Sequence, residues 1–220
     1  MKICEVLKKI DELAPQELAY SFDNVGLLCG SGERELTSVL LTLDLDLGVI
    51  EEAKKLEAYG ADLIAIPCNT AHYFYDGVAK ETSIPVLNII TETVNYLHGV
   101  GVKKAALFAT EGTCKSGTYQ AVSAGKVEIV TPDEADRDII TSIIFDDIKR
   151  GREPDIEKFI SVAEKMREGG CERIILGCTE LSLIKKNYKQ IKQSNFYTDS
   201  LEMLARKTVI ECGKPCREQI

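Results

Sequence analysis

The chain has 220 residues, 45% of them hydrophobic, and carries a net charge of −8 with a pI near 5.0. That is enough apolar material for one large domain or two small lobes with their own cores. So acidic a chain lacks the basic surface that nucleic-acid binding requires, and any attraction for an anionic substrate must be local. Eight cysteines, no apolar leader at the N-terminus and no bilayer-length apolar stretch predict reduced thiols in a cytoplasmic protein that makes no use of a membrane.

Strands and helices alternate along the chain. In the first part of the chain we expect a helix over 3–13, strands over 24–29 and 37–44, and a helix over 46–58. There follow a strand over 62–68, a helix from about 70 to before 85, a strand over 85–89 and a helix over 91–98. The remainder is expected to form a strand over 104–109, a helix to about 124, a strand over 127–130, helices to about 149 and 167, a strand ending at 178, a strand over 195–197 and a helix to about 211. This alternation predicts an α/β fold with mainly parallel sheets flanked by helices.

Two stretches, 62–70 and 172–180, repeat one pattern. Each has a charged start, a run of apolar β-formers, a Pro or Gly, a Cys, and a Thr within two residues. Such runs predict strands buried on both faces, so Cys68 and Cys178 would lie at strand ends, at the sheet edge where α/β proteins bind ligands. A helix N-terminus is expected just after each Cys. Its backbone N–H groups would favour a thiolate and also bind a carboxylate.

Three short blocks resemble the aspartate/glutamate racemase superfamily from about residue 54 to the C-terminus. They cover 68–72 (CNTAH), 110–113 (TEGT, with Tyr119 behind it) and 177–181 (GCTEL). Glu180 stands where glutamate racemases usually carry His, which favours the aspartate racemase branch. The resemblance implies two pseudo-symmetric lobes with the active site in the cleft between them. Residues 1–97, completed by 199–220, would form the first lobe, and 98–198 the second.

The first part of the chain resembles a different family. Segments 13–15, 22–27 and 39–44 are similar to the start of the di-metal type 2 GTP cyclohydrolase I homologues. That family continues with a His-His-Pro metal motif, whereas this chain has Ile-Pro-Cys at 66–68, so no metal site is carried over. The sequence therefore reads as a fusion with its junction near 52–56, and residues 1–53 are a foreign segment within the first lobe.

The racemase resemblance implies a cofactor-independent amino-acid racemase, with aspartate as the favoured substrate. Such an enzyme needs two acid/base groups flanking Cα, and Cys suits this role. The implied catalytic pair is Cys68 and Cys178. The implied substrate-binding residues are Asn69, Thr70, Thr110, Thr113 and Thr179, with His72 and Glu180 orienting or tuning the thiols. No cofactor and no metal are expected. The expected partner is a small amino acid or dicarboxylate, and a homodimer is left open.

Each feature also has a plainer interpretation. A cysteine at a strand end is usually a small buried hydrophobe, the threonine turn can simply cap a helix, and Glu180 can serve the helix dipole. Cys68 with His72, or Cys212 with Cys216, has a spacing that zinc can use. The alternative functions are a racemase or isomerase of another small acid, such as maleate or a hydantoin, a fusion protein that binds carboxylates without catalysis, and a metal-binding protein.

Overall fold

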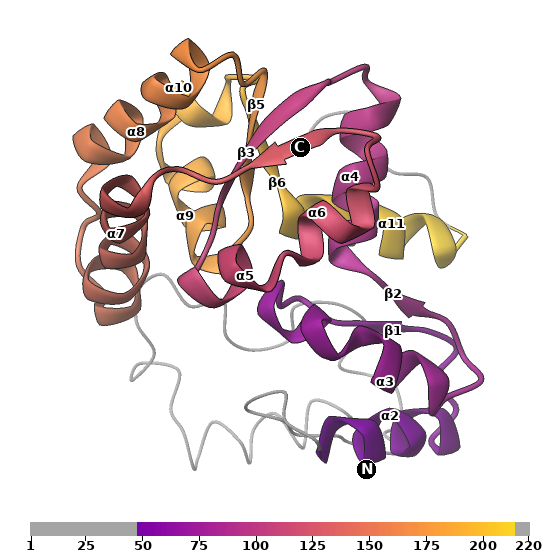
Figure 1. Ribbon diagram of the computed structural model, residues 1–220. Coiled ribbons are helices and arrows are strands. Elements are labelled where there is room, and N and C mark those ends of the chain that lie inside the picture. The colour runs from indigo at the N-terminus through magenta and orange to yellow at the C-terminus, as the bar shows by residue number, and fades with distance from the viewer. Residues whose placement is uncertain (1–47, 214–220) are drawn as a thin grey trace.

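The computed structural model describes residues 48–213, which form two parallel β-sheets with helices packed against them (Figure 1). The expected helix over 3–13 and strands over 24–29 and 37–44 lie outside the described residues. The predicted α/β class with parallel sheets flanked by helices is confirmed. The division into lobes at residue 98 stays a prediction. No helix within 48–213 is long and apolar enough to cross a membrane.

The described elements begin with a helix and then alternate much as the sequence predicts. In order they are α2 (Gly48–Ala58), β1 (Ile64–Ala65), η2 (Thr70–Phe74), α3 (Tyr75–Lys80), β2 (Val86–Leu87), α4 (Ile89–Gly99), β3 (Lys104–Phe108), α5 (Glu111–Ser116), α6 (Thr118–Ser123), β4 (Glu128–Val130), α7 (Glu134–Ser142), η3 (Ile143–Asp147), η4 (Ile148–Arg150), α8 (Ile156–Glu168), β5 (Arg173–Leu176), α9 (Thr179–Asn187), α10 (Lys189–Lys192), β6 (Tyr197–Asp199) and α11 (Ser200–Glu211).

The larger sheet has four parallel strands in the order β4-β3-β5-β6. Successive residues of its central strands point to opposite faces, so Ala106 and Phe108 pack on one side while Ala105 and Leu107 pack on the other. Helices α7, α8, α9 and α10 cover the first face, and α4, α6 and α11 cover the second (Figure 1). Both faces are buried, which explains why β3 and β5 are continuous apolar runs.

The smaller sheet consists of β1 and β2, which pair in parallel through only two residues each. The strand expected over 62–68 is therefore shorter than predicted, because its ladder ends where β2 ends. A separate core formed by Ile64, Ile66, Val78 and Val86, with Ala53 from α2, holds this sheet against α2 and α3. Cys68 follows in the loop that joins β1 to η2.

The strand order of the larger sheet fixes where a ligand site is expected. The connection from β3 leads to β4 on one side of β3, while β5 lies on the other side, so the order in which strands are added to the sheet reverses at β3. In open parallel sheets ligands bind at such a switch point, just beyond the carboxyl ends of the strands. Those ends are followed by Thr110 after β3 and by Cys178 after β5.

Three expected helices are divided, and the first of them, expected from about 70 to before 85, forms the 3₁₀ segment η2 followed by α3. The helix expected to run to about 124 breaks at Gly117, whose φ of 65° ends α5 and begins α6, because this left-handed conformation is readily adopted only by glycine. The helix expected to run to about 149 changes at Ile143 into one π-helical segment and then a 3₁₀ turn. Lys149, which reaches the candidate site described below, lies within this 3₁₀ turn.

Gly177 allows the two central strands to approach each other at the switch point. A Cβ atom placed there would lie 2.6 Å from Leu107 Cδ1, which is fully buried, and 3.2 Å from Ala109 Cβ. We expect Gly177→Ala to lower the free energy of unfolding by about 1–3 kcal/mol through overpacking. Gly99→Ala, where the added Cβ meets nothing within 4 Å, is the control and should leave stability unchanged or slightly raised. Urea denaturation measures both, and equal stabilities would contradict the packing argument.

Candidate active site

Three threonine hydroxyls from two separate strand ends meet in one cluster. Thr70 Oγ1, on η2 after β1, lies 2.7 Å from Thr113 Oγ1 and 3.3 Å from Thr110 Oγ1, both on the segment after β3. Thr110 also caps α5, because its hydroxyl accepts a hydrogen bond from the Thr113 N–H. Thr110 therefore does cap the helix, and it also contacts Thr70, which directly follows the loop that carries Cys68. These three predicted site residues are brought together by the fold.

Asn69 is buried and both ends of its side-chain amide are bonded inside the protein. Its Nδ2 donates to Ser200 Oγ at 3.0 Å, and its Oδ1 accepts from the Tyr119 hydroxyl at 2.7 Å. Ser200 Oγ in turn donates to the Leu176 carbonyl at 2.8 Å. A continuous set of hydrogen bonds thus links the residue after Cys68 to the last residue of β5, two positions before Cys178. Asn69, Ser200 and Tyr119 are each at most 4% exposed.

His72 is a buried imidazole that connects two backbone segments. Its Nε2 accepts from the Ile89 N–H at 3.2 Å, and a nitrogen that accepts carries no proton. The proton therefore lies on Nδ1, which donates to the Cys68 carbonyl oxygen at 2.8 Å. Both ring nitrogens are committed to the backbone, so the ring supports the Cys68 loop and leaves no ligand atom for zinc. Within residues 48–213 no group of three or more His, Cys, Asp or Glu side chains could hold a metal ion.

Cys178 is held as a thiol. Its Sγ donates to Glu180 Oε2 at 2.8 Å. Burial, the negative charge of Glu180 and that hydrogen bond raise the pKa of the Cys178 thiol well above its ordinary value near 9. Burial alone would raise the pKa of Glu180, but the hydrogen bond from Cys178 and the charge of Lys149 outweigh it and lower that pKa. Lys149 Nζ lies 3.4 Å from Glu180 Oε1, so the group is a thiol beside an ion pair.

The surroundings of the two thiols differ. Cys68 is exposed in the β1–η2 loop, whereas Cys178 is partly buried at the start of α9. Thr179 Oγ1 lies 3.3 Å from the Glu180 carboxylate and so belongs to the Cys178 group. Two residues of the site escaped the sequence analysis, Ser200 and Lys149. Neither residue lies in a motif. Ser200 is a lone serine at the start of a helix, and Lys149 is one lysine among many.

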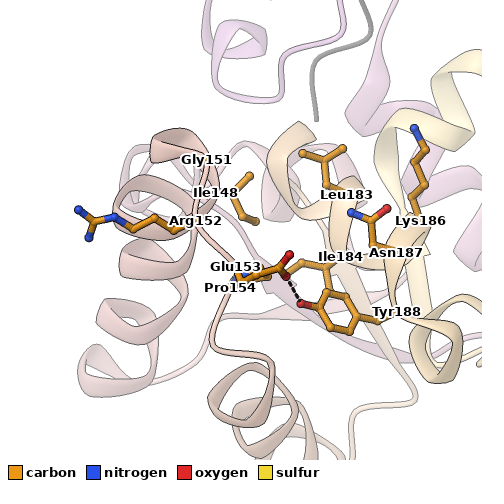
Figure 2. Close-up of a pocket in the computed structure, with 10 residues that line it drawn as sticks. All are labelled: Ile148, Gly151, Arg152, Glu153, Pro154, Leu183, Ile184, Lys186, Asn187 and Tyr188. Carbon is orange, nitrogen blue, oxygen red and sulfur yellow. Dashed lines mark hydrogen bonds between the residues drawn. The ribbon is translucent and has the colours of Figure 1, made fainter. Parts of the chain in front are cut away.

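A separate pocket of about 180 Å³ lies beside the second half of α9 (Figure 2). None of the residues that line it is a predicted site residue. Its polar groups partly satisfy each other, because the Tyr188 hydroxyl donates to the Glu153 carboxylate at 2.9 Å. In Figure 2 the Arg152 side chain points away from the pocket. The lining residues are Ile148, Gly151, Arg152, Glu153, Pro154, Leu183, Ile184, Lys186, Asn187 and Tyr188.

Comparison with known proteins gives the family. The model of the Asp/Glu/hydantoin racemase family matches residues 5–208. The chain belongs to the Asp/Glu/hydantoin racemase family. The crystal structure of an aspartate racemase homologue from Pyrococcus horikoshii is 31% identical, with a TM-score of 0.65 over 75% of this chain and 73% of that one. A broad-specificity amino-acid racemase of Bacillus subtilis is 40% identical over 82 residues, which are 37% of this chain and 36% of the relative. The match thus spans about a third of that relative's length.

The N-terminal resemblance is confirmed as well. A GTP cyclohydrolase 1 type 2 homologue of Clostridium perfringens is 44% identical over 64 residues, which are 29% of this chain and 23% of the relative, and the similarity falls at the N-terminus. The Asp/Glu/hydantoin racemase model nevertheless begins at residue 5 and so extends beyond the stretch from about residue 54 that carries the recognisable motifs. The first 47 residues lie outside the described structure.

The neutral state of His72 makes stability depend on pH. Burial lowers the pKa of His72 below its ordinary value near 6.5, so the unfolded chain binds a proton more readily than the folded one. The stabilising contribution is therefore fully present above that ordinary value and is lost as the pH falls below it. We expect His72→Gln to reduce the loss of unfolding free energy between about pH 7.5 and about pH 5. His98→Gln, an exposed histidine on α4, should leave the loss unchanged, and equal pH slopes in all three proteins would contradict the assignment.

Glu180 should control the ionisation of Cys178. We expect Glu180→Gln to lower the pKa of Cys178, because it removes the adjacent negative charge and leaves Lys149 without its ion-pair partner. At about pH 8 the rate of alkylation at Cys178 should rise on the order of tenfold for each unit by which the pKa falls. Mass spectrometry gives this rate, with Cys114, whose pKa burial raises to about 11, as an internal reference. Glu81→Gln, which removes an exposed acid paired with Lys54, is the matched control.

Proposed function

We propose that the chain is a cofactor-independent amino-acid racemase that uses Cys68 and Cys178 as its two acid/base groups, with aspartate as the favoured substrate. The observation that carries the proposal is the hydrogen-bonded joining of the two cysteine loops. Asn69 follows Cys68 and bonds to Ser200, which bonds to Leu176 beside the Cys178 turn. Family membership supports racemisation as the reaction class, and the position of Cys178 at the β3–β5 switch point supports the placement of the site.

The electrostatics favour a protonated resting state for Cys178. Cys178 starts as the protonated acid, because burial and Glu180 disfavour its thiolate. Cys68, as thiolate, removes the Cα proton from one face of the substrate while the Cys178 thiol delivers a proton to the other face. The thiolate left on Cys178 lies beside a carboxylate, so it is a strong base for the reverse reaction. Lys149 offsets part of the charge that then develops.

The substrate carboxylates require local donors, because the chain as a whole is acidic. The hydroxyls of Thr70, Thr110 and Thr113 form one donor cluster, and Thr179 lies at the start of α9, where its hydroxyl donates to Glu180 in the absence of substrate. Backbone N–H groups in the first turn of α9 add donors with a favourable helix dipole. We assign carboxylate binding to these groups. Asn69, whose amide is already engaged by Ser200 and Tyr119, serves mainly to hold the loop in place.

Two observations favour aspartate as the substrate. Glu180 in place of His separates this chain from glutamate racemases, and the Pyrococcus structure is that of an aspartate racemase homologue. A panel of aspartate, glutamate, neutral amino acids and small diacids will decide the substrate.

Solvent deuterium tests the two-base mechanism. We expect the full-length protein, incubated in deuterated water with L-aspartate and no added metal, to place deuterium in the product enantiomer before the remaining substrate, because different groups serve the two faces. Cys68→Ser and Cys178→Ser should each reduce racemisation by roughly 10²–10⁴-fold. Cys212→Ser, an exposed cysteine at the end of α11, is the control and should keep full activity.

Two outcomes would overturn this proposal. Full activity in either Cys68→Ser or Cys178→Ser would remove that thiol from the mechanism. Binding of carboxylates without Cα exchange for any member of the panel would support the alternative of a binding protein without catalysis. Exchange with another acid but not with aspartate would keep the mechanism and change the substrate.

A further inference from the structure

We propose that Ser200 and Tyr119 are positioning residues that set the geometry of the two cysteine loops. Neither lies in a loop that carries a cysteine. Ser200 is the first residue of α11, and Tyr119 lies on α6. This inference rests on the proposed racemase function of Cys68 and Cys178, and it adds the residues that hold those thiols at a fixed separation.

The Ser200 hydroxyl joins the two loops. It accepts from Asn69 Nδ2 at 3.0 Å and donates its one proton to the Leu176 carbonyl at 2.8 Å. Leu176 is the last residue of β5, where it pairs with Asp199 of β6. The carbonyl thus belongs to the rigid sheet, and the hydroxyl extends that rigidity to the loop after β1.

Tyr119 fixes the other side of the same amide. Its hydroxyl donates to Asn69 Oδ1 at 2.7 Å. Tyr119 and Ser200 are completely buried, and Asn69 is 4% exposed. Because Asn69 is held at both ends, its backbone has little freedom to rotate, and Cys68 is the residue directly before it. His72 fixes the Cys68 carbonyl from the opposite direction.

The hydrogen bonds of the Asn69 amide to Ser200 and Tyr119 explain how these polar side chains can be buried. Buried polar side chains destabilise a protein unless every partner is present, so a complete network specifies one arrangement of the elements that contribute to it. Here the contributors are the β1–η2 loop, α6, α11 and the end of β5. Proton transfer at one carbon by two thiols depends on their separation, and a displacement of about 1 Å can cost on the order of 100-fold in rate.

The test compares Ser200→Ala and Tyr119→Phe with controls matched in residue type and burial. Ser123→Ala removes another buried serine hydroxyl, which bonds only to Val127, and Tyr197→Phe alters another buried tyrosine, in β6. At a temperature where all variants are fully folded by circular dichroism, we expect Ser200→Ala and Tyr119→Phe to lower kcat about tenfold or more, with KM within about twofold. Both controls should keep the wild-type kcat.

A double variant distinguishes a shared network from two independent losses. Ser200→Ala combined with Tyr119→Phe should lose little more than the stronger single variant, because both remove support from the same amide. Ser200→Ala combined with Tyr197→Phe should be no slower than Ser200→Ala. Wild-type kcat in the Ser200 and Tyr119 variants, or an equal fall in the controls, would overturn the positioning role.

An activity-independent measurement separates this inference from the proposed function. The rate of alkylation at Cys178 relative to Cys114, followed by mass spectrometry of the native protein, reports how well the Cys178 turn is held. We expect it to rise severalfold in Ser200→Ala and Tyr119→Phe and to stay unchanged in both controls. If the wild type racemises no substrate, the proposed function fails while this measurement still decides whether Ser200 and Tyr119 hold the turn. Unchanged alkylation together with wild-type kcat would refute the inference alone.

Discussion

The order of the four parallel strands is the constraint on which the candidate site depends. Because β4 and β5 lie on opposite sides of β3, the segments leaving β3 and β5 diverge to different faces and leave the ends of those strands uncovered by their own connections. Thr110 and Cys178 occupy those ends. Gly177 allows the strands to stay close there, since a side chain at that position would meet Leu107. The packing of an apolar sheet thus decides where polar, reactive side chains become available.

The second sheet contributes the other half of the site through hydrogen bonds at two places. The Thr70 hydroxyl meets those of Thr110 and Thr113, and the Asn69 amide meets Ser200. Each contact joins residues that are at least 40 positions apart in the chain. A loop carrying an exposed thiol is held by polar contacts on two sides and by His72 on a third, which suits a site where a small molecule must reach the thiol.

Electrostatics keep the Cys178 thiol protonated at rest. Glu180 accepts a hydrogen bond from the Cys178 thiol and also forms an ion pair with Lys149. The carboxylate stays ionised because it has these two partners, and its charge keeps Cys178 protonated. A single acidic residue therefore explains how one thiol is kept as the acid at rest. A helix N-terminus alone would have favoured the thiolate, as the sequence analysis assumed for both cysteines.

The sequence by itself determined the class of fold, the family and the ends of strands at which the cysteines lie, because apolar runs and Gly or Pro breakers act locally. It also predicted the threonine groups through the motif blocks. It did not determine that Asn69 and His72 are engaged within the protein, since their partners Ser200 and Ile89 lie far along the chain. Nor did it predict Lys149 or Ser200, which no local pattern distinguishes. Only the tertiary structure decided these pairings, because hydrogen bonds between buried side chains depend on how separate helices and strands pack, not on their spacing in the sequence.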